Sequence, residues 1–144
     1  MILLDVNVAL AAHRNDHPHH ESVRPWFNRL TAGDEQFGVP DVVWSAFVRL
    51  ATNTRIFEVP TPIDDAFAFL RAVRAQPNHV TIVPGEAHLA IFEDVCRRFD
   101  ATGDLVPDAY LVAIAMEVGA GIASFDRDFA RFEDLDWIIP DAAG

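Results

Sequence analysis

The chain has 144 residues, 51% of them hydrophobic, and a formal net charge of −11 at pH 7. This length suffices for one hydrophobic core and is too short for two ordinary domains. The charge argues against a nucleic-acid binder that works through a broad basic surface, and the absence of lysine excludes P-loop phosphate binding and Schiff-base chemistry.

The first half of the chain is expected to begin with a strand and continue with helices. The apolar run Ile2–Val6 predicts a short β-strand. His20–Leu30 is expected to be helical, although Pro25 removes a hydrogen bond and should kink or shorten the helix. The segment Asp41–Thr52 predicts a helix whose inner side carries Val43, Ala46, Phe47 and Leu50.

The second half continues the alternation of helices and strands. Thr61-Pro62-Ile63-Asp64 carries the signals of a helix N-terminus. The helix that follows is expected to turn inward its apolar positions Ile63, Ala66, Phe67, Leu70 and Val73. Pro107–Val118 predicts a helix buried almost all round. Further short strands are expected at Val80–Val83, Gly121–Phe125 and Trp137–Ile139.

Together these elements predict one three-layer α/β/α domain. The strand-like runs are continuously apolar, which is typical of parallel strands covered by helices on both faces. We expect residues 1–140 to form this domain and residues 141–144 a short tail. No apolar stretch approaches the roughly 18 residues of a membrane span, and no basic segment precedes the first strand, so we expect a soluble, cytoplasmic protein.

Three aspartates stand where strand ends and a helix start could converge. Asp5 interrupts the first apolar strand near its C-terminal end, where a charge is costly unless it is paired or binds a metal. Asp126 directly follows the strand Gly121–Phe125, at the equivalent end. Asp108 lies in the first turn of the most apolar helix, where the helix dipole favours an anion. If the three converge, they form an acidic site.

Such a site needs a compensating cation. Two carboxylates about 4 Å apart repel by roughly 4 kcal/mol at an effective dielectric constant near 20. With no lysine available, a hard divalent ion such as Mg²⁺ or Mn²⁺ is the natural partner for oxygen ligands. Two of the acids also have a structural alternative: Asp126 with Asp128 could form a turn, and Asp108 after Pro107 could cap its helix. Asp5, inside an apolar strand, favours a functional role.

Three blocks of sequence resemble the PIN-domain VapC toxins in order and spacing. They are Leu4–Val8, Leu105–Ala115 and Gly119–Phe129, and the segment Trp44–Phe57 is similar to the branch of these toxins that is abundant in mycobacteria. The resemblance implies an endoribonuclease that uses Mg²⁺ or Mn²⁺ to cleave structured RNA, commonly tRNA or a ribosomal RNA loop. It also implies a homodimer and a cognate VapB antitoxin, with Asp5, Asp108 and Asp126 as metal ligands.

The chain departs from the family pattern at one position. The family usually carries a glutamate on the helix after the second strand, and alignment on Arg49 places Ala46 there. Asp128, Asp104 or Glu86 could replace this acid, or all three could simply be exposed. A binding module of the same fold with weakened or lost catalysis is therefore the main alternative, and whether the site holds one metal or two stays open.

Other polar groups have both functional and structural interpretations. Arg49 belongs to a polar stripe on its predicted helix and could hold a substrate phosphate or form a solvated face. His13, His17, His19 and His20 could bind zinc, but no cysteine completes a tetrahedral set, so surface exposure and contact with RNA or antitoxin are the alternatives. A dehalogenase-like phosphatase or receiver domain would also place an aspartate like Asp5, but the absence of lysine disfavours both.

Overall fold

A four-stranded parallel sheet lies at the centre of the computed structural model, which describes residues 1–141. The strand order is β2-β1-β3-β4, with all neighbours parallel. The bounds of the strands are β1 Ile2–Leu4, β2 Phe37–Gly38, β3 Gly121–Ala123 and β4 Trp137–Ile138. In this register Leu3 pairs with both Gly38 and Ile122, so the C-terminal ends of β1 and β3 meet at one edge of the sheet.

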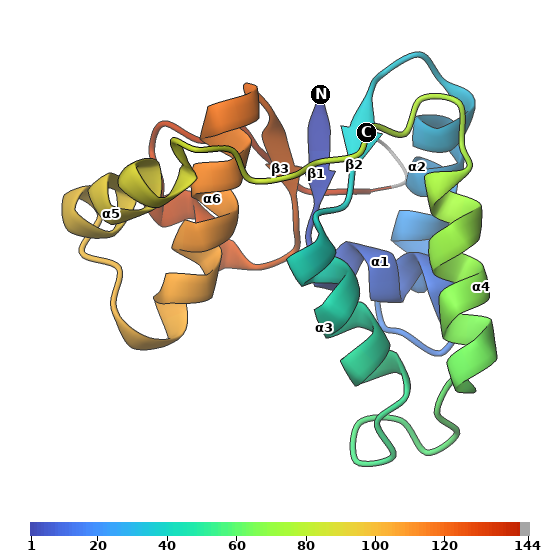
Figure 1. Ribbon diagram of the computed structural model, residues 1–144. Helices are drawn as coiled ribbons and strands as arrows, with labels where there is room; N and C mark the ends of the chain where they lie inside the picture. Colours follow the sequence, from blue (N-terminus) through green and yellow to red (C-terminus); the bar gives the residue numbers. More distant parts are fainter. Residues whose placement is uncertain (142–144) are drawn as a thin grey trace.

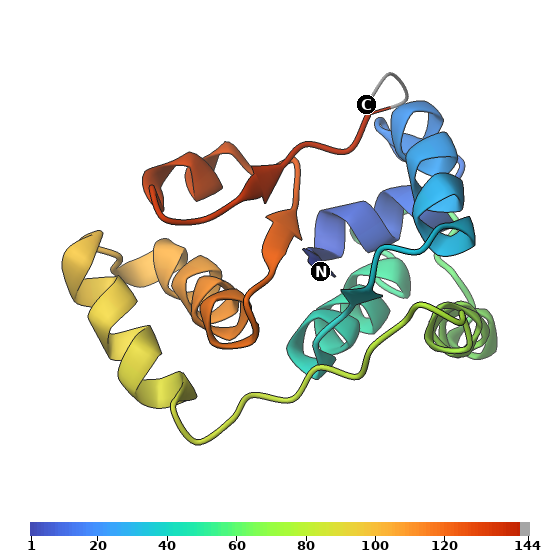
Figure 2. The ribbon, with the colours of Figure 1, turned by 90° about the horizontal axis from the view of Figure 1, so that it is seen from above.

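Helices cover both faces of the sheet. Their bounds are α1 Val6–His13, α2 His20–Ala32, α3 Asp41–Ala51, α4 Ile63–Arg74, α5 His88–Arg98 and α6 Val106–Val118. Figures 1 and 2 place α5 and α6 on one side of the sheet and α1 and α2 on the other. Helix α3 packs on α1, and α4 packs on α3. This is the predicted three-layer α/β/α arrangement.

The core forms where the apolar strands meet the most apolar helices. Leu3, Leu4 and Ile122 are buried in the sheet, and the adjoining helices bury Val8–Ala12 of α1 and most of α6 from Ala109 to Ala115. Burial on both faces explains why these strands lack an alternating pattern. The described residues contain no helix long and apolar enough to cross a membrane.

The prediction of a strand at Val80–Val83 was wrong. This segment runs beside β2, where the Val80 amide donates to the Phe37 carbonyl (2.8 Å), but only an isolated bridge between Phe37 and His79 forms. Ile82 is buried but Val83 is 68% exposed, so only part of this apolar run packs on the core. On the side of β1 away from β3, the pairing strand is the two-residue segment Phe37–Gly38, which is too short to have a sequence signature.

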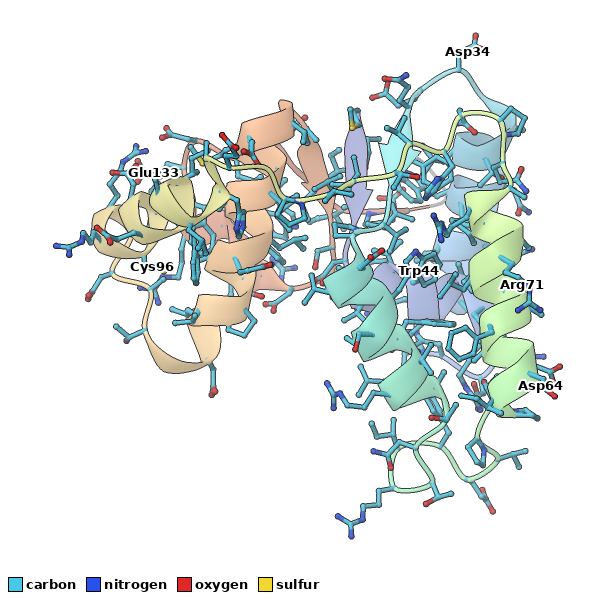
Figure 3. The ribbon with its side chains drawn as sticks, viewed as in Figure 1. Asp34, Trp44, Asp64, Arg71, Cys96 and Glu133 are labelled. Atoms are coloured by element: carbon cyan, nitrogen blue, oxygen red, sulfur yellow. The ribbon has the colours of Figure 1, made fainter. Side chains whose placement is uncertain are left out.

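Helix α4 turns only part of its predicted apolar face to the core. Ala66 and Val73 are buried as expected, but Ile63 and Phe67 are 52% and 42% exposed. Helix α4 lies at one side of the molecule, and its inner face carries Phe69, whose ring contacts the rings of Phe27, Trp44 and Phe47. Figure 3 shows Trp44 on α3 directed toward this packing between α3 and α4.

The remaining predicted helices are present, and two further α-helices within residues 1–141 were not predicted. Helix α2 continues to Ala32 despite Pro25, and α3 and α6 end within a residue of the expected positions. The unpredicted helices are α1, which follows β1 without a turn, and α5, which carries the lone Cys96. The predicted tail lies outside the described residues except for Asp141.

Candidate metal centre

Asp5 lies at the junction of β1 and α1. Its amide donates to the Ala123 carbonyl (3.0 Å), which extends the β1–β3 ladder by one bond. Its side chain caps α1, because Oδ1 accepts from the Val6 amide at 2.7 Å. A strand that ends in a helix-capping aspartate therefore places a carboxylate at the C-terminal edge of the parallel sheet, where ligands of such sheets bind.

Ser124 connects Asp5 to the loop that follows β3. The buried Ser124 hydroxyl donates to Asp5 Oδ2 (2.7 Å) and accepts from the Asn7 side-chain amide (3.0 Å) and the Asp126 backbone amide (3.0 Å). Asn7 Oδ1 in turn accepts from the Phe125 amide at 3.2 Å. These bonds use the one donor and two acceptor positions of the hydroxyl, so the β1 and β3 ends are fixed together.

Sequence reasoning missed Ser124 and Asn7 as parts of the site. The signal that identified Asp5 was also present for these two residues. Ser124 follows an apolar strand, and Asn7 lies at the start of an apolar helix. Single polar residues of this kind are common in capping positions, which is why the pattern alone did not separate them.

Three carboxylates gather at the same edge of the sheet. Asp108 stands in the first turn of α6, and Asp126 caps the 3₁₀ helix η2 (Arg127–Arg131) by accepting from the Asp128 amide (2.9 Å). Carboxylate oxygens of Asp108, Asp126 and Asp128 all lie within 4.8 Å of one another. The structure therefore brings two of the predicted acids together and adds Asp128.

Asp5 faces the same pocket without belonging to that tight group. A pocket of about 290 Å³ is lined by Asp5, Asn7, Asp108 and Asp126. The apolar part of its wall is formed by Val6, Val42, Val43, Ala46, Pro107 and Leu111, and Arg49 of α3 is the basic residue in the lining. The predicted convergence of the three aspartates is thus present in the geometry.

Ala46 and the three acids that could replace its missing carboxylate lie at different distances from the site. Ala46 lines the pocket, so a carboxylate at this position would project toward the acids. Asp128 joins Asp108 and Asp126, although it is exposed. Asp104 and Glu86 are exposed and lie outside the group formed by the described residues. Of the three candidates, only Asp128 is where a replacement ligand would be needed.

The pocket holds negative charge that its own groups do not balance. Burial, followed in order of effect by the carboxylates of Asp126, Asp5 and Asp128, raises the pKa of Asp108 to about 7. Burial also raises the pKa of Asp5, against the opposing hydrogen bonds from Ser124 and Val6, while Asp126 adds to the increase. Carboxyl groups are held close together here at an electrostatic cost.

This donor set fits a hard divalent cation. Oxygen ligands on a partly open pocket suit Mg²⁺ or Mn²⁺, which retain several waters. A cation would also remove the repulsion that raises the Asp108 pKa. The histidine cluster does not offer a second centre among residues 1–141: His13 contacts Phe47 and Phe69, and His20 Nδ1 bonds the Ala11 carbonyl.

Comparisons with known proteins agree with this geometry. The family model for the PIN domain matches residues 2–135. The chain is 56% identical to the Mycobacterium tuberculosis ribonucleases VapC25 and VapC31 over 140 residues, which cover 97% of this chain and 99% of each relative. A solved chain of the Rickettsia felis VapBC2 complex, bound to a DNA fragment from its promoter, superposes with a TM-score of 0.70 at 14% identity and covers 98% of this chain and 100% of that one. At 14% identity, this structural similarity shows a shared fold.

Proposed function

This chain belongs to the PIN-domain family, and from that premise we propose that it is a metal-dependent endoribonuclease that cleaves structured RNA. The observation that carries the proposal is the group of Asp108, Asp126 and Asp128, with Asp5 on the same pocket and an Asp108 pKa of about 7. A folded protein that keeps such groups close together gains from a bound cation.

In this proposal Asp5, Asp108 and Asp126 hold Mg²⁺ or Mn²⁺, with Asp128 as a further oxygen donor that replaces the acid missing at Ala46. When bound, such an ion polarises a phosphate oxygen and lowers the pKa of coordinated water for attack on the phosphodiester. Ser124 and Asn7 orient the ligands, since Ser124 fixes Asp5 Oδ2 and the Asp126 backbone at the same time.

Arg49 is proposed to bind a phosphate of the RNA. It is exposed on α3 and lies in the lining of the acidic pocket, where a guanidinium can form paired hydrogen bonds to phosphate oxygens. With a formal net charge of −11, the chain would select RNA by its shape and by bases exposed in loops. A tRNA or a ribosomal RNA loop is the expected class of target.

We further propose a VapB-type antitoxin as the partner and a homodimer as the assembly. The comparison with the VapBC2 complex supports the partner at the level of the fold. The apolar side chains of Ile63 and Phe67 on α4, and a hollow of about 180 Å³ between α2 and α4 lined by Phe27 and Phe69, offer surfaces for a protein partner.

Mapping of RNA ends tests the nuclease proposal. Purified protein is incubated with total RNA in Mg²⁺, in Mn²⁺ and with EDTA, and new 5′ ends are sequenced. We expect cleavage at few sites that requires the metal and is lost in Asp5→Asn and Asp108→Asn, while Asp104→Asn, which alters an exposed acid outside the cluster, stays active. Expression without the antitoxin should arrest growth, and Asp5→Asn should relieve the arrest.

The alternative function is a PIN-fold binding module without catalysis, motivated by Ala46. Growth arrest with intact RNA would favour this module and contradict the nuclease. Calorimetric titration separates the two in a second way, because a module that has lost catalysis has no need to retain Mg²⁺ affinity.

A further inference from the structure

Two aromatic rings from distant parts of the chain are stacked where the loop that carries Asp126 begins. The His19 and Phe125 rings lie 4.0 Å apart between centroids with an interplanar angle of 4°. Phe125 directly precedes Asp126, and its amide belongs to the Asn7 and Ser124 network. The stack is therefore one residue away from a proposed metal ligand.

The loop that carries His19 is held in place independently of the stack. Arg14 makes two hydrogen bonds to Asp16 (2.9 and 2.7 Å) and one to the Val59 carbonyl (2.8 Å). His17 Nδ1 accepts from the His19 amide at 3.1 Å, and the His17 ring lies 5.8 Å from the His19 ring. These bonds hold the backbone that carries His19, and the contact with Phe125 orients the His19 ring.

His19 remains exposed although one part of its ring is stacked. Within residues 1–141 its side chain makes no hydrogen bond to the protein, so both ring nitrogens are available to a ligand. A ring that serves core packing would be buried, as His88 is. Exposed, pre-positioned aromatic rings are what proteins use to hold unstacked bases of single-stranded RNA.

We propose that His19 and Phe125 form a stacking platform for one unpaired base of the RNA substrate, next to the phosphate that is cleaved. This inference rests on the proposed nuclease function and adds a base subsite to it. The platform selects a splayed-out base, so it restricts cleavage to loops, bulges and single-stranded ends. Because every base has an aromatic face, the subsite selects an unpaired nucleotide more than a particular base.

The test uses a short RNA hairpin that carries one 2-aminopurine in its loop, moved through the loop positions one at a time. Binding is measured with Ca²⁺ in place of Mg²⁺, and a gel checks that the RNA stays intact. For wild type we expect fluorescence quenching at one loop position. His19→Ala should abolish that quenching and weaken binding about five- to one-hundred-fold, whereas His19→Phe, which keeps a ring, should retain most of both.

Two controls separate folding and loop effects from stacking. Asn15→Ala removes another exposed side chain of the same loop and should bind as wild type does, and thermal unfolding should be unchanged in all variants. An abasic nucleotide at the quenched position should weaken RNA binding by wild type but not by His19→Ala.

Equal binding by wild type and His19→Ala, with cleavage intact, would overturn the stacking platform and leave the nuclease proposal standing. Normal RNA binding with weaker antitoxin binding would assign these rings to the protein partner and also overturn it. Wild type that binds no RNA would overturn both proposals.

Discussion

The hydroxyl of Ser124 donates to Asp5 Oδ2 at 2.7 Å across 119 positions of sequence. The Ser124 hydroxyl oxygen also accepts from the Asn7 side-chain amide and from the Asp126 backbone amide, so one small side chain sets the relative position of two proposed metal ligands. The bond also lowers the pKa of Asp5, in opposition to the effect of burial. Ser124 therefore connects the geometry of the site with its charge.

Ser124→Ala should damage both stability and activity. The substitution leaves partly buried groups of Asp5, Asn7 and Asp126 without this hydrogen-bond partner, which costs about 1–3 kcal/mol in the free energy of unfolding. The Asp5 pKa should rise further, so the pH profile of cleavage should move to higher pH. Urea unfolding and a pH series of cleavage rates measure the two effects. Ser45→Ala, on the exposed side of α3, is the matched control, and an unchanged pH profile in Ser124→Ala would contradict the role given to this hydroxyl.

Asp108 should make the metal-free protein less stable as pH rises. Its pKa is about 7 in the folded state and 3.8 in the reference state, so between these values the folded protein binds more protons than the unfolded chain. The free energy of unfolding then falls as pH increases through this window. Asp108→Asn should flatten the dependence and raise Tm at pH 7.5 by about 3 °C or more, but not at pH 4.

Metal should reverse this effect in wild type. Mg²⁺ or Mn²⁺ added at pH 7.5 should raise Tm, because binding to the folded state alone stabilises it. The increase should be small in Asp108→Asn. Differential scanning fluorimetry of wild type and Asp108→Asn, in EDTA and in metal at pH 4 and pH 7.5, measures these changes in Tm. A wild-type Tm that rises between pH 4 and pH 7.5 in EDTA would argue against a crowded, uncompensated site.

Arg49→Ala should weaken RNA binding without altering the metal site. The KM for cleavage should rise about ten-fold, the size of one charge-assisted hydrogen bond to phosphate, while metal affinity stays constant. Arg71→Ala on the exposed face of α4 should have little effect on either quantity (Figure 3). If Arg49→Ala lowers metal affinity and leaves KM unchanged, Arg49 acts on the carboxylates instead of on RNA.

Ala46→Glu should add an acid to the pocket wall. Ala46 already lines the pocket, so the new carboxylate would face the others and increase their repulsion in the absence of metal. We expect a lower Tm in EDTA, a larger gain on adding Mn²⁺, and tighter or additional metal binding in calorimetry. Ala46→Gln, of similar size and without charge, is the control. Identical metal binding by the two variants would show that this wall does not face the ion.

The sequence predicted the parts of this structure in which one signal dominated. Helix α6 is apolar at nearly every position and is buried as expected, and Asp5 stood out because a charge in an apolar strand needs a partner. Helix α1 was missed because Val6–His13 continues the apolarity of β1 without a helical period. Strand β1 ends at Leu4 because the next residue, Asp5, caps helix α1.

Features that depend on contacts between distant residues could not be predicted from the sequence. Val80–Val83 has the composition of a strand, but Val80 is joined to β2 by one hydrogen bond, from its amide to the Phe37 carbonyl. Asp128 could not be separated from Asp104 or Glu86, since all are exposed acids and only the fold of η2 brings Asp128 to Asp126. Ser124 gained its place in the site through a contact with a residue at the opposite end of the chain.

Crystals grown with Mn²⁺ test the central claim most directly, because anomalous scattering locates the ion without reference to activity. The account predicts a strong peak in the pocket, at coordination distance of roughly 2.1 Å from carboxylate oxygens that include Asp5, Asp108 and Asp126. Asp108→Asn crystals should lose most of it. A wild-type map with no peak at these acids, or with manganese bound only elsewhere on the protein, would contradict the account.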